Sequence, residues 1–321
     1  MTVPFDSSFE MQDPAAVPKA TAAQPRSFRP KSQRHWPVEY DPPANEIIVG
    51  VVVPFDFALD WEYWRYLPPR VILHFTRTPF LRLPVGVPLS RAVGRPSVVA
   101  RATRTLLAVN PAAVLYACTS GSFVDGVAHD ERIRAAMAAA GARNPVTTSS
   151  AMLDGFRATG IKKIALATPY TDTLTRRLCT FLEEGGIEIV SCHYLGLSEN
   201  MAKVSKSTIA SLTRGLDTTK ADAVFVSCTS LRTYGIVNDL EAEMGRPVFT
   251  SNQVSLWRAL VAAGALPRPK RAPSPRWTMG GPPPIALSTR LLMDASATVR
   301  SWDLPVGPSS PEMHQRELSL G

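Results

Sequence analysis

Several signatures that would assign a function directly are missing from this 321-residue sequence. It contains no glycine-rich loop of the Gly-x-Gly-x-x-Gly or Walker type, which argues against a nucleotide as a required partner. Its four cysteines include no pair at metal-binding spacing and do not form a disulfide framework in a chain of this length. Reduced thiols fit better, so we expect a cytoplasmic protein without a metal cluster.

Long apolar runs and clustered charges are missing as well. No segment approaches the roughly 18 apolar residues of a membrane span, and the N-terminal region lacks the apolar stretch of a signal peptide. The net charge of +8 is spread along the chain without a basic run interleaved with aromatic residues. We therefore expect neither a membrane nor a nucleic acid as partner. A mild positive field that attracts small carboxylates fits the charge, as does a role in solubility alone.

The most informative feature that is present is a motif that occurs twice. Residues 113–122 read AVLYACTSGS, and residues 223–230 read AVFVSCTS. Each copy begins with Ala-Val, continues as an apolar strand and ends in Cys-Thr-Ser. A single cysteine is most often a small buried hydrophobe, but the shared frame favours function for Cys118 and Cys228. Cys179 and Cys192 have no repeated frame, and we expect them in the core.

Between residues 46 and 264 the chain alternates strand-like and helix-like segments. The β-branched run at 47–53 is typical of a strand buried on both faces of a parallel sheet, and the alternation predicts parallel α/β layers with right-handed crossovers. The expected strands are 47–53, 71–78, 112–117, 145–148, 163–167, 188–194, 223–227 and 247–250. The expected helices are 61–67, 97–109, 129–140, 150–159, 172–184, 201–216, 235–244 and 252–263. Residues 79–97 give only weak signals.

Both repeated cysteines fall at the carboxyl end of a predicted strand, where α/β sheets bind their ligands. Backbone N–H groups and hydroxyls that follow each cysteine suit a carboxylate. The hydroxyl residues are Thr119 and Ser120 in the first copy, and Thr229 and Ser230 in the second. The same positive dipole is expected to lower the pKa of each thiol and so to give a nucleophile or base. Two such half-sites facing each other would hold a small acid between two sulfur atoms.

Other candidate residues follow predicted strands but have competing structural roles. Tyr170 lies in a predicted turn at a strand end, where its hydroxyl could bind substrate or simply face solvent. Asn200 lies in a loop, with turn formation as the alternative. Asp56 follows the first strand, where helix capping competes evenly with a role in catalysis. Ser251 and Asn252 open the last helix, and capping is the default interpretation for both.

These segments together resemble the aspartate/glutamate racemase superfamily. Within it, the chain is similar to the branch that holds maleate cis-trans isomerase, arylmalonate decarboxylase and the ectoine-utilisation protein A group. The matching segments, spread over about residues 46–264, are VVVPFD (51–56), LHFTRTP (73–79), YACTSGS (116–122), ATPY (167–170), VSCTSLRT (226–233) and SNQV (251–254). The segment 54–60 looks closest to the ectoine-utilisation group.

The resemblance implies two pseudo-symmetric α/β domains, an active site in the cleft between them, no cofactor and a homodimer. We expect residues 45–140 plus 245–264 in the first domain and 141–244 in the second. Residues 1–44 are expected to form a disordered leader, and the Pro- and Arg-rich residues 265–321 a mostly disordered tail.

The resemblance also implies roles for individual residues. In maleate isomerase-like enzymes the cysteine matching Cys118 adds to the substrate double bond, and the one matching Cys228 handles the proton. In the racemases the same two positions share proton removal and return. Tyr170 and Asn200 match positions that bind carboxylate in the isomerases.

The chain departs from the maleate isomerases at Asp56, where those enzymes carry an asparagine. A second negative charge at ~4 Å costs on the order of a few kcal/mol at intermediate dielectric, so maleate suits this site poorly. A substrate with an amino or amide group, such as an intermediate of ectoine breakdown, suits it better. Our leading hypothesis is a cofactor-independent isomerase or racemase. The alternatives are a decarboxylase of the arylmalonate type, which would lack the first cysteine, and a non-catalytic protein that binds a small acid.

Overall fold

The computed structural model describes residues 46–68, 70–266 and Thr289. The predicted leader, and the predicted tail apart from residues 265, 266 and 289, lie outside the described residues. Thr289 accepts a hydrogen bond of 2.6 Å from the side-chain amide of Gln253.

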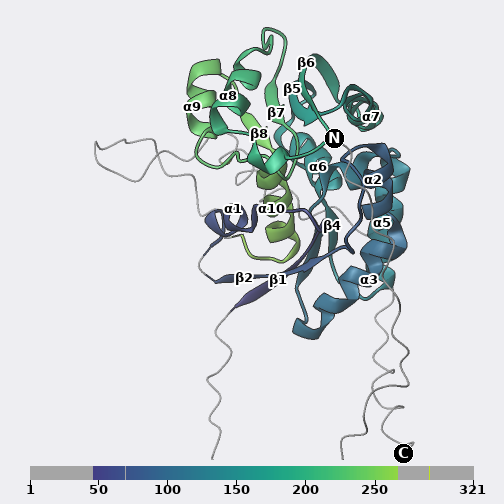
Figure 1. The fold of residues 1–321 in the computed structure, drawn as a ribbon. Coiled ribbons are helices and arrows are strands. Elements are labelled where there is room, and N and C mark those ends of the chain that lie inside the picture. The colour runs from purple at the N-terminus through teal and green to yellow at the C-terminus, as the bar shows by residue number, and fades with distance from the viewer. Residues whose placement is uncertain (1–45, 69, 267–288, 290–321) are drawn as a thin grey trace, which may run out of the picture. The chain divides into compact units, whose positions relative to one another are not determined.

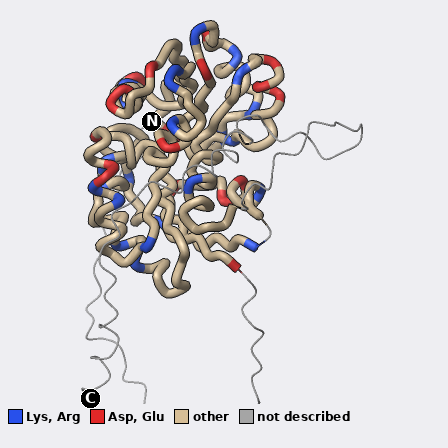
Figure 2. Tube along the Cα trace, turned by 180° about the vertical axis from the view of Figure 1, so that it is seen from behind, with Lys and Arg blue, Asp and Glu red and all other residues tan. Residues whose placement is uncertain are grey.

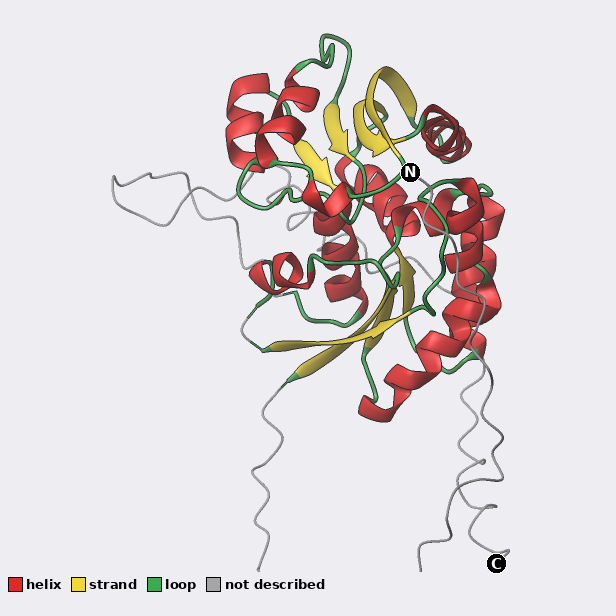
Figure 3. Ribbon diagram, viewed as in Figure 1, coloured by secondary structure: helices red, strands yellow, loops and turns green. Residues whose placement is uncertain are grey.

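The described strands form two four-stranded parallel sheets, which confirms the predicted α/β class (Figures 1 and 3). The strand order is β2-β1-β3-β4 in the first sheet and β6-β5-β7-β8 in the second, so the second sheet repeats the order of the first. The strands of the first sheet are β1 (Ile47–Val53), β2 (Val71–Arg77), β3 (Ala113–Tyr116) and β4 (Pro145–Thr147). Those of the second are β5 (Lys163–Tyr170), β6 (Glu188–Leu197), β7 (Ala223–Val226) and β8 (Val248–Thr250).

The helices lie largely where the sequence predicts them. They are α1 (Asp60–Arg65), α2 (Val87–Val93), α3 (Pro96–Leu106), α4 (Thr119–Phe123), α5 (Val127–Ala139), α6 (Thr148–Thr159), α7 (Asp172–Glu184), α8 (Lys206–Arg214), α9 (Val237–Met244) and α10 (Ser251–Ala262), with short 3-10 turns at Leu107–Val109 and Met201–Lys203. Two helices, α2 and α4, were not predicted. Strand β5 also continues through Tyr170, where a turn was expected.

The grouping of two strands differs from the predicted domains. Strand β4 pairs with β3 in the first sheet, although residues 145–147 were assigned to the second domain. Strand β8 pairs with β7 in the second sheet, although residues 248–250 were assigned to the first. Each of these strands directly follows, in space, the strand that carries a cysteine motif at its end. The domain boundaries as such stay a prediction.

The central strands are buried on both faces, as continuous apolar runs in parallel sheets are expected to be. In β1, Val51 packs into a core cluster with residues of α1 and α10, whereas Val52 packs on the other face with residues of α2, α3 and α5. The same alternation continues in β3 and places Cys118 on the face of α2 and α3, together with Tyr116. The period of two along the strand therefore decides which helices the first cysteine meets.

Helix α10 belongs to the cores of both sheets. Val254 and Trp257 pack into the cluster formed by the second sheet, and Leu256 and Leu260 pack into the cluster of the first. Nine of the twelve residues of α10 are buried, and the polar ones among them lie mainly in its first turn. The first residue of α10, Ser251, bonds both Thr119, which follows β3, and Cys228, which follows β7.

Lys and Arg residues and Asp and Glu residues are both scattered along the described chain (Figure 2). Within residues 46–68 and 70–266, no helix is both long enough and apolar enough to cross a bilayer. The same described residues contain no group of three or more His, Cys, Asp or Glu arranged to hold a metal ion.

Candidate functional site

A cavity of about 40 Å³ lies at the carboxyl ends of strands from both sheets. Its lining includes every predicted site residue except Asn200, namely Asp56, Cys118, Thr119, Ser120, Tyr170, Cys228, Thr229 and Ser230. Beside the cavity, Val85 N–H of its lining donates a hydrogen bond of 2.7 Å to the Ser198 carbonyl.

A larger hollow of about 530 Å³ lies elsewhere, between the turn before α5 and the outer face of α7. Both of its arginines are paired with carboxylates, because Arg177 bonds Asp125 at 3.3 Å and Arg176 bonds Asp172 at 2.8 Å. It contains none of the predicted residues. The small cavity is the candidate site because it gathers buried thiols and hydroxyls from both sheets.

Cys118 ends β3 and begins helix α4. Its backbone is extended, with φ of −143°, and its sulfur accepts a hydrogen bond of 3.3 Å from Gly121 N–H. A Cβ atom at Gly121 would lie 2.3 Å from the Tyr116 hydroxyl and 3.0 Å from the Cys118 sulfur, so only glycine fits there. A Cβ at Gly94 would lie 2.0 Å from the Gly121 carbonyl, so α2 and α4 meet through bare backbone.

Cys228 follows β7 with a different backbone. Its φ is +113°, a region that favours glycine, and holding another residue there costs about 1–3 kcal/mol. The sulfur accepts a hydrogen bond of 3.4 Å from Ser230 N–H, and the N–H of Cys228 itself donates to the Ser251 hydroxyl at 2.9 Å. The surrounding structure therefore holds this residue in place.

The pKa of both thiols is raised, which contradicts the expectation that a strand-end dipole lowers it. Burial raises the pKa of Cys118 to about 11, against the hydrogen bond from Gly121 N–H and the nearby hydroxyls of Tyr116 and Ser120. Burial raises the pKa of Cys228 to about 12, against the Ser230 N–H and the Tyr170 hydroxyl. The prediction was wrong because removing a thiolate from water costs more than one or two N–H donors return. Both residues are accordingly neutral thiols at pH 7.

Each cysteine has a buried tyrosine beside it. The Tyr116 hydroxyl donates to the Val93 carbonyl at 3.0 Å and lies near the sulfur of Cys118. Tyr170, at the end of β5, lies beside Cys228 and makes no hydrogen bond of normal length through its hydroxyl within the described residues. Tyr170 is 2% exposed rather than at the surface, so this buried donor is available to a ligand in the cavity.

Asp56 lines the cavity after β1, although the residue as a whole is exposed. Partial desolvation raises the pKa of its carboxyl, and its own backbone N–H and the Arg77 guanidinium oppose that rise. Its charge in turn contributes to the raised pKa of Cys118 and of Cys228. The three groups therefore share one electrostatic environment.

Asn200 is not brought to the cavity. It is exposed, has a φ of +58° and precedes the 3-10 turn Met201–Lys203. Its neighbour Met201 reaches the cavity instead. The left-handed backbone agrees with the turn-forming alternative, and the binding role of Asn200 stays a prediction.

An apolar part of the lining was missed by the sequence. It consists of Val85, Leu89, Val93 and Met201. The first three come from the stretch with weak signals, where α2 begins after Gly86 and carries a proline in its first turn. Proline at the start of a helix followed by apolar residues was the signal that could have located them.

Two buried polar residues that tie the second cysteine segment to distant elements were also missed. Glu62 of α1 accepts hydrogen bonds from Thr233 N–H at 3.1 Å, from the Thr233 hydroxyl at 2.6 Å and from the Asn252 amide at 3.1 Å. Burial raises the pKa of the Glu62 carboxyl, against these donors. Ser251 does not cap α10, because Thr250 accepts the capping bond. Neither role has a local sequence signal.

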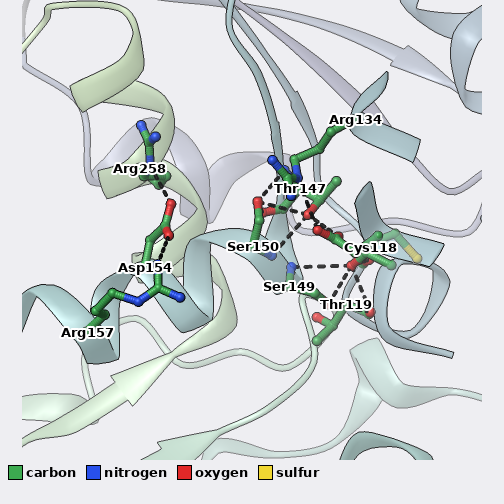
Figure 4. A network of polar contacts seen from close by, with 11 residues as sticks. Cys118, Thr119, Arg134, Thr147, Ser149, Ser150, Asp154, Arg157 and Arg258 are labelled. Atoms are coloured by element: carbon green, nitrogen blue, oxygen red, sulfur yellow. Dashed lines mark hydrogen bonds and ion pairs between the residues drawn. The ribbon is translucent and has the colours of Figure 1, made fainter. Parts of the chain in front are cut away.

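A hydroxyl network surrounds the first cysteine segment (Figure 4). The Ser122 hydroxyl donates to the Cys118 carbonyl at 2.7 Å and lies 2.7 Å from the Ser149 hydroxyl. Ser149 in turn donates to the Thr119 carbonyl at 3.3 Å. Near this network, Figure 4 shows Asp154 of α6 between Arg157 of the same helix and Arg258 of α10. The ion pair of Asp154 with Arg258 joins α6 to α10. The segment 118–122 is thus fixed by contacts with α6.

Comparisons with known proteins find arylmalonate decarboxylases and maleate isomerases among the relatives of this chain. The family model described as arylmalonate decarboxylase matches residues 95–273. Arylmalonate decarboxylase of Bordetella bronchiseptica is 35% identical over 157 residues, which is 47% of this chain and 65% of that protein. A maleate isomerase of Geobacillus stearothermophilus is 28% identical over 153 residues, which is 45% of this chain and 61% of that protein. The matches thus span less than two thirds of the length of these two relatives.

Solved structures extend the likeness to most of the described chain. A double mutant of arylmalonate decarboxylase in its liganded form has a TM-score of 0.63 and 29% identity, over 68% of this chain and 93% of that one. A maleate cis-trans isomerase mutant of Nocardia farcinica, which carries a covalently bound succinylcysteine intermediate, has a TM-score of 0.61 and 21% identity, over 68% and 93%. The latter similarity concerns the fold alone.

Proposed function

Because the chain belongs to the arylmalonate decarboxylase family, we propose that it is a cofactor-independent isomerase or racemase that acts on a small carboxylic acid through Cys118 and Cys228. The observation that supports this is that two buried thiols, from equivalent strands of two sheets, line one cavity. Both reactions need two groups that reach one substrate from different sides, one to attack or take a proton and one to supply it.

In the isomerase form, the Cys118 thiol first loses its proton to solvent, and the resulting thiolate adds to one carbon of a C=C bond. The electron pair moves to the neighbouring carbon, and the Cys228 thiol gives that carbon its proton, so the central bond becomes single and rotates. Cys228 then takes a proton back and the C–S bond breaks. We assign attack to Cys118 because it matches the cysteine that adds to the double bond in the maleate isomerase-like enzymes that the chain resembles. The Nocardia relative carries a cysteine adduct of this kind.

In the racemase form, one cysteine takes the proton from the α-carbon and the other returns one on the opposite face. Asp56 favours this form, because its carboxylate would attract an amino or amide group and repel a second carboxylate. With the resemblance of residues 54–60, this leads us to place the substrate among the amino-acid intermediates of ectoine breakdown. The hydroxyls of Thr119, Ser120 and Tyr170 would bind its carboxylate.

A decarboxylase is the second candidate, and two observations favour it. The identity to the Bordetella decarboxylase is 35%, and the cavity has an apolar wall formed by Val85, Leu89, Val93 and Met201. An apolar surface disfavours a carboxylate placed against it, which would promote loss of CO₂. Cys118 has no evident role in that reaction.

The test is to incubate the protein in D₂O with maleate, with small amino acids from ectoine breakdown and with arylmalonates, and to follow each by NMR. We expect deuterium at the α-carbon of an amino acid. Isomerisation of maleate without exchange into any amino acid would contradict our interpretation of Asp56. Release of CO₂ from an arylmalonate alone would establish the second candidate. Binding without turnover of any acid would make the protein a small-acid sensor and refute the enzyme.

A further inference from the structure

Ser251 is the residue at which the two Cys-Thr-Ser segments meet. Its side chain is fully buried at the start of α10. Its hydroxyl oxygen accepts a hydrogen bond of 2.9 Å from Cys228 N–H and one of 3.2 Å from the Thr119 hydroxyl. One oxygen atom thus contacts the backbone of the second cysteine and the side chain that directly follows the first.

Helix capping does not account for this serine. The N-cap of α10 is Thr250, whose hydroxyl accepts the Gln253 N–H at 3.2 Å. A serine one position later has no capping bond to make, and a buried hydroxyl without partners costs free energy. The Ser251 hydroxyl therefore serves to accept the hydrogen bonds from the two cysteine segments.

The two segments need such a connection because they belong to separate sheets. In the described chain, the first four strands pair with one another in one sheet, and the last four pair in the other. On the first side, Thr119 is fixed by the Ser149 and Ser122 hydroxyls, which donate to its carbonyl at 3.3 and 3.0 Å. On the second side, Cys228 has a φ of +113° and would relax without a partner for its N–H.

We propose that Ser251 is a positioning residue that sets the separation and orientation of the Cys118 and Cys228 sulfur atoms. It acts through Thr119 and the backbone of Cys228 and does not touch the substrate. The role rests on the proposed function, in which both sulfur atoms serve one substrate. Without the Ser251 hydroxyl, the strained Cys228 backbone relaxes, whereas Cys118 stays fixed by α4 and α6.

The experiment compares Ser251→Ala with Ser255→Ala. Ser255 is the matched control, because it lies one turn further along α10, is also fully buried and also bonds a hydroxyl across to α6, that of Thr148 at 2.9 Å. Iodoacetamide is added to each folded protein, and the alkylation rates of Cys118 and Cys228 are read by peptide mass spectrometry. We expect Ser251→Ala to raise the rate at Cys228 relative to Cys118 about tenfold, and Ser255→Ala to leave that ratio within twofold.

Turnover gives a second, separate readout. With the acid identified in D₂O, we expect Ser251→Ala to lower kcat at least tenfold with KM within about threefold, and Ser255→Ala to change neither beyond threefold. If the ratio of the alkylation rate at Cys228 to that at Cys118 is the same in the two variants, the positioning role of Ser251 is overturned, whatever Tm each variant has. Absence of turnover in the wild-type protein would instead refute the proposed function, and the alkylation ratio would still test Ser251.

Discussion

The two Cys-Thr-Ser segments have the same sequence and different backbones. After Cys118 the chain enters α4 directly, and the sulfur takes the N–H of Gly121, three residues on. After Cys228 the chain turns without a helix, and the sulfur takes the N–H of Ser230, two residues on. The segments diverge at the fourth position, where Gly121 permits close helical packing against Tyr116 and the fully buried Leu231 does not.

The segments also differ in what holds them. The first is fixed mainly by hydroxyls of α4 and α6, whereas the second depends on Ser251 and, through Thr233, on Glu62 at the other end of the described chain. The repeated sequence therefore places the two cysteines at equivalent strand ends, but different contacts hold them there. We expect Cys118 to be rigid and reactive as a nucleophile, and Cys228 to be strained and dependent on distant contacts.

The largest expected effect is the loss of turnover when either cysteine of the cavity is replaced. Cys118→Ser and Cys228→Ser should each lower kcat by about 10²–10⁴-fold, the usual worth of a positioned acid or base. If the substrate is unsaturated, a covalent adduct should accumulate in Cys228→Ser alone, because water can protonate the adduct there but the thiolate that removes this proton again is missing. Intact-protein mass spectrometry detects it. Cys179→Ser, outside the cavity, should keep full activity, and an adduct on Cys228 in the other variant would reverse our assignment.

The next largest expected effect is the change of the thiol alkylation rates with pH. Because only the thiolate reacts, rates at Cys118 and Cys228 should rise about 100-fold between pH 8 and pH 10. The rates at both cysteines should go on rising at high pH, because burial raises the pKa to about 11 for Cys118 and about 12 for Cys228. Cys179 is the internal control, since a hydrogen bond with Cys192 lowers its pKa and its rate should level off first.

The same raised pKa values have a consequence for stability. Unfolded thiols titrate near ~8.5, so above this pH the unfolded chain loses protons that the folded protein keeps. The stability that the buried neutral thiols contribute is therefore fully present below about pH 8.5. It is lost as the pH rises through the pKa values of these thiols in the folded protein. Denaturation in urea at pH 8 and pH 10 measures the difference, and a more stable protein at pH 10 would contradict the burial of the thiols.

Glu62→Gln should weaken the second segment without affecting the first. The carboxylate accepts three hydrogen bonds, and an amide offers one oxygen, so we expect a loss of about 1–3 kcal/mol in the free energy of unfolding. Alkylation should become faster at Cys228 and stay unchanged at Cys118. Asp60→Asn is the control in the same helix, because its pair with Arg77 is surface-exposed and such pairs contribute about 0–1 kcal/mol. Equal losses in the two variants would show that Glu62 has no special role.

The smallest expected effect concerns the backbone itself. Glycine relieves a φ of +113° but gains nothing at −143°. Cys118→Gly should thus destabilise the protein more than Cys228→Gly, by about 1 kcal/mol, the lower end of the strain at such positions. Thermal unfolding of the two variants measures it. A larger loss in Cys228→Gly would mean that the segment is not strained.

Features that depend on local pattern were predictable from the sequence. The eight strands follow from apolar runs of the right length, and the shared frame of Cys118 and Cys228 placed both cysteines at equivalent strand ends. Helix α2 was missed because it is short and lies among prolines. Helix α4 was missed because the hydroxyl residues of TSGSF have no helical apolar period.

Features that depend on tertiary contacts were not predictable in this way. The thiol pKa prediction used a local dipole and left out burial, which is a property of the whole fold. Ser251 was assigned to capping because its neighbours suggest a helix start, whereas its partners Thr119 and Cys228 are distant in sequence. The role of Glu62 depends on Thr233, 171 residues away.

Helix α10 has a consequence for the order in which this chain acquires structure during synthesis. It is the last helix before residue 266 and supplies Leu256 and Leu260 to the core of the first sheet, whose strands β1 to β4 leave the ribosome long before it. One face of the first sheet therefore lacks these side chains until α10 has been made. A nascent chain that stops before α10 exposes part of this apolar face, and such surface is prone to aggregation.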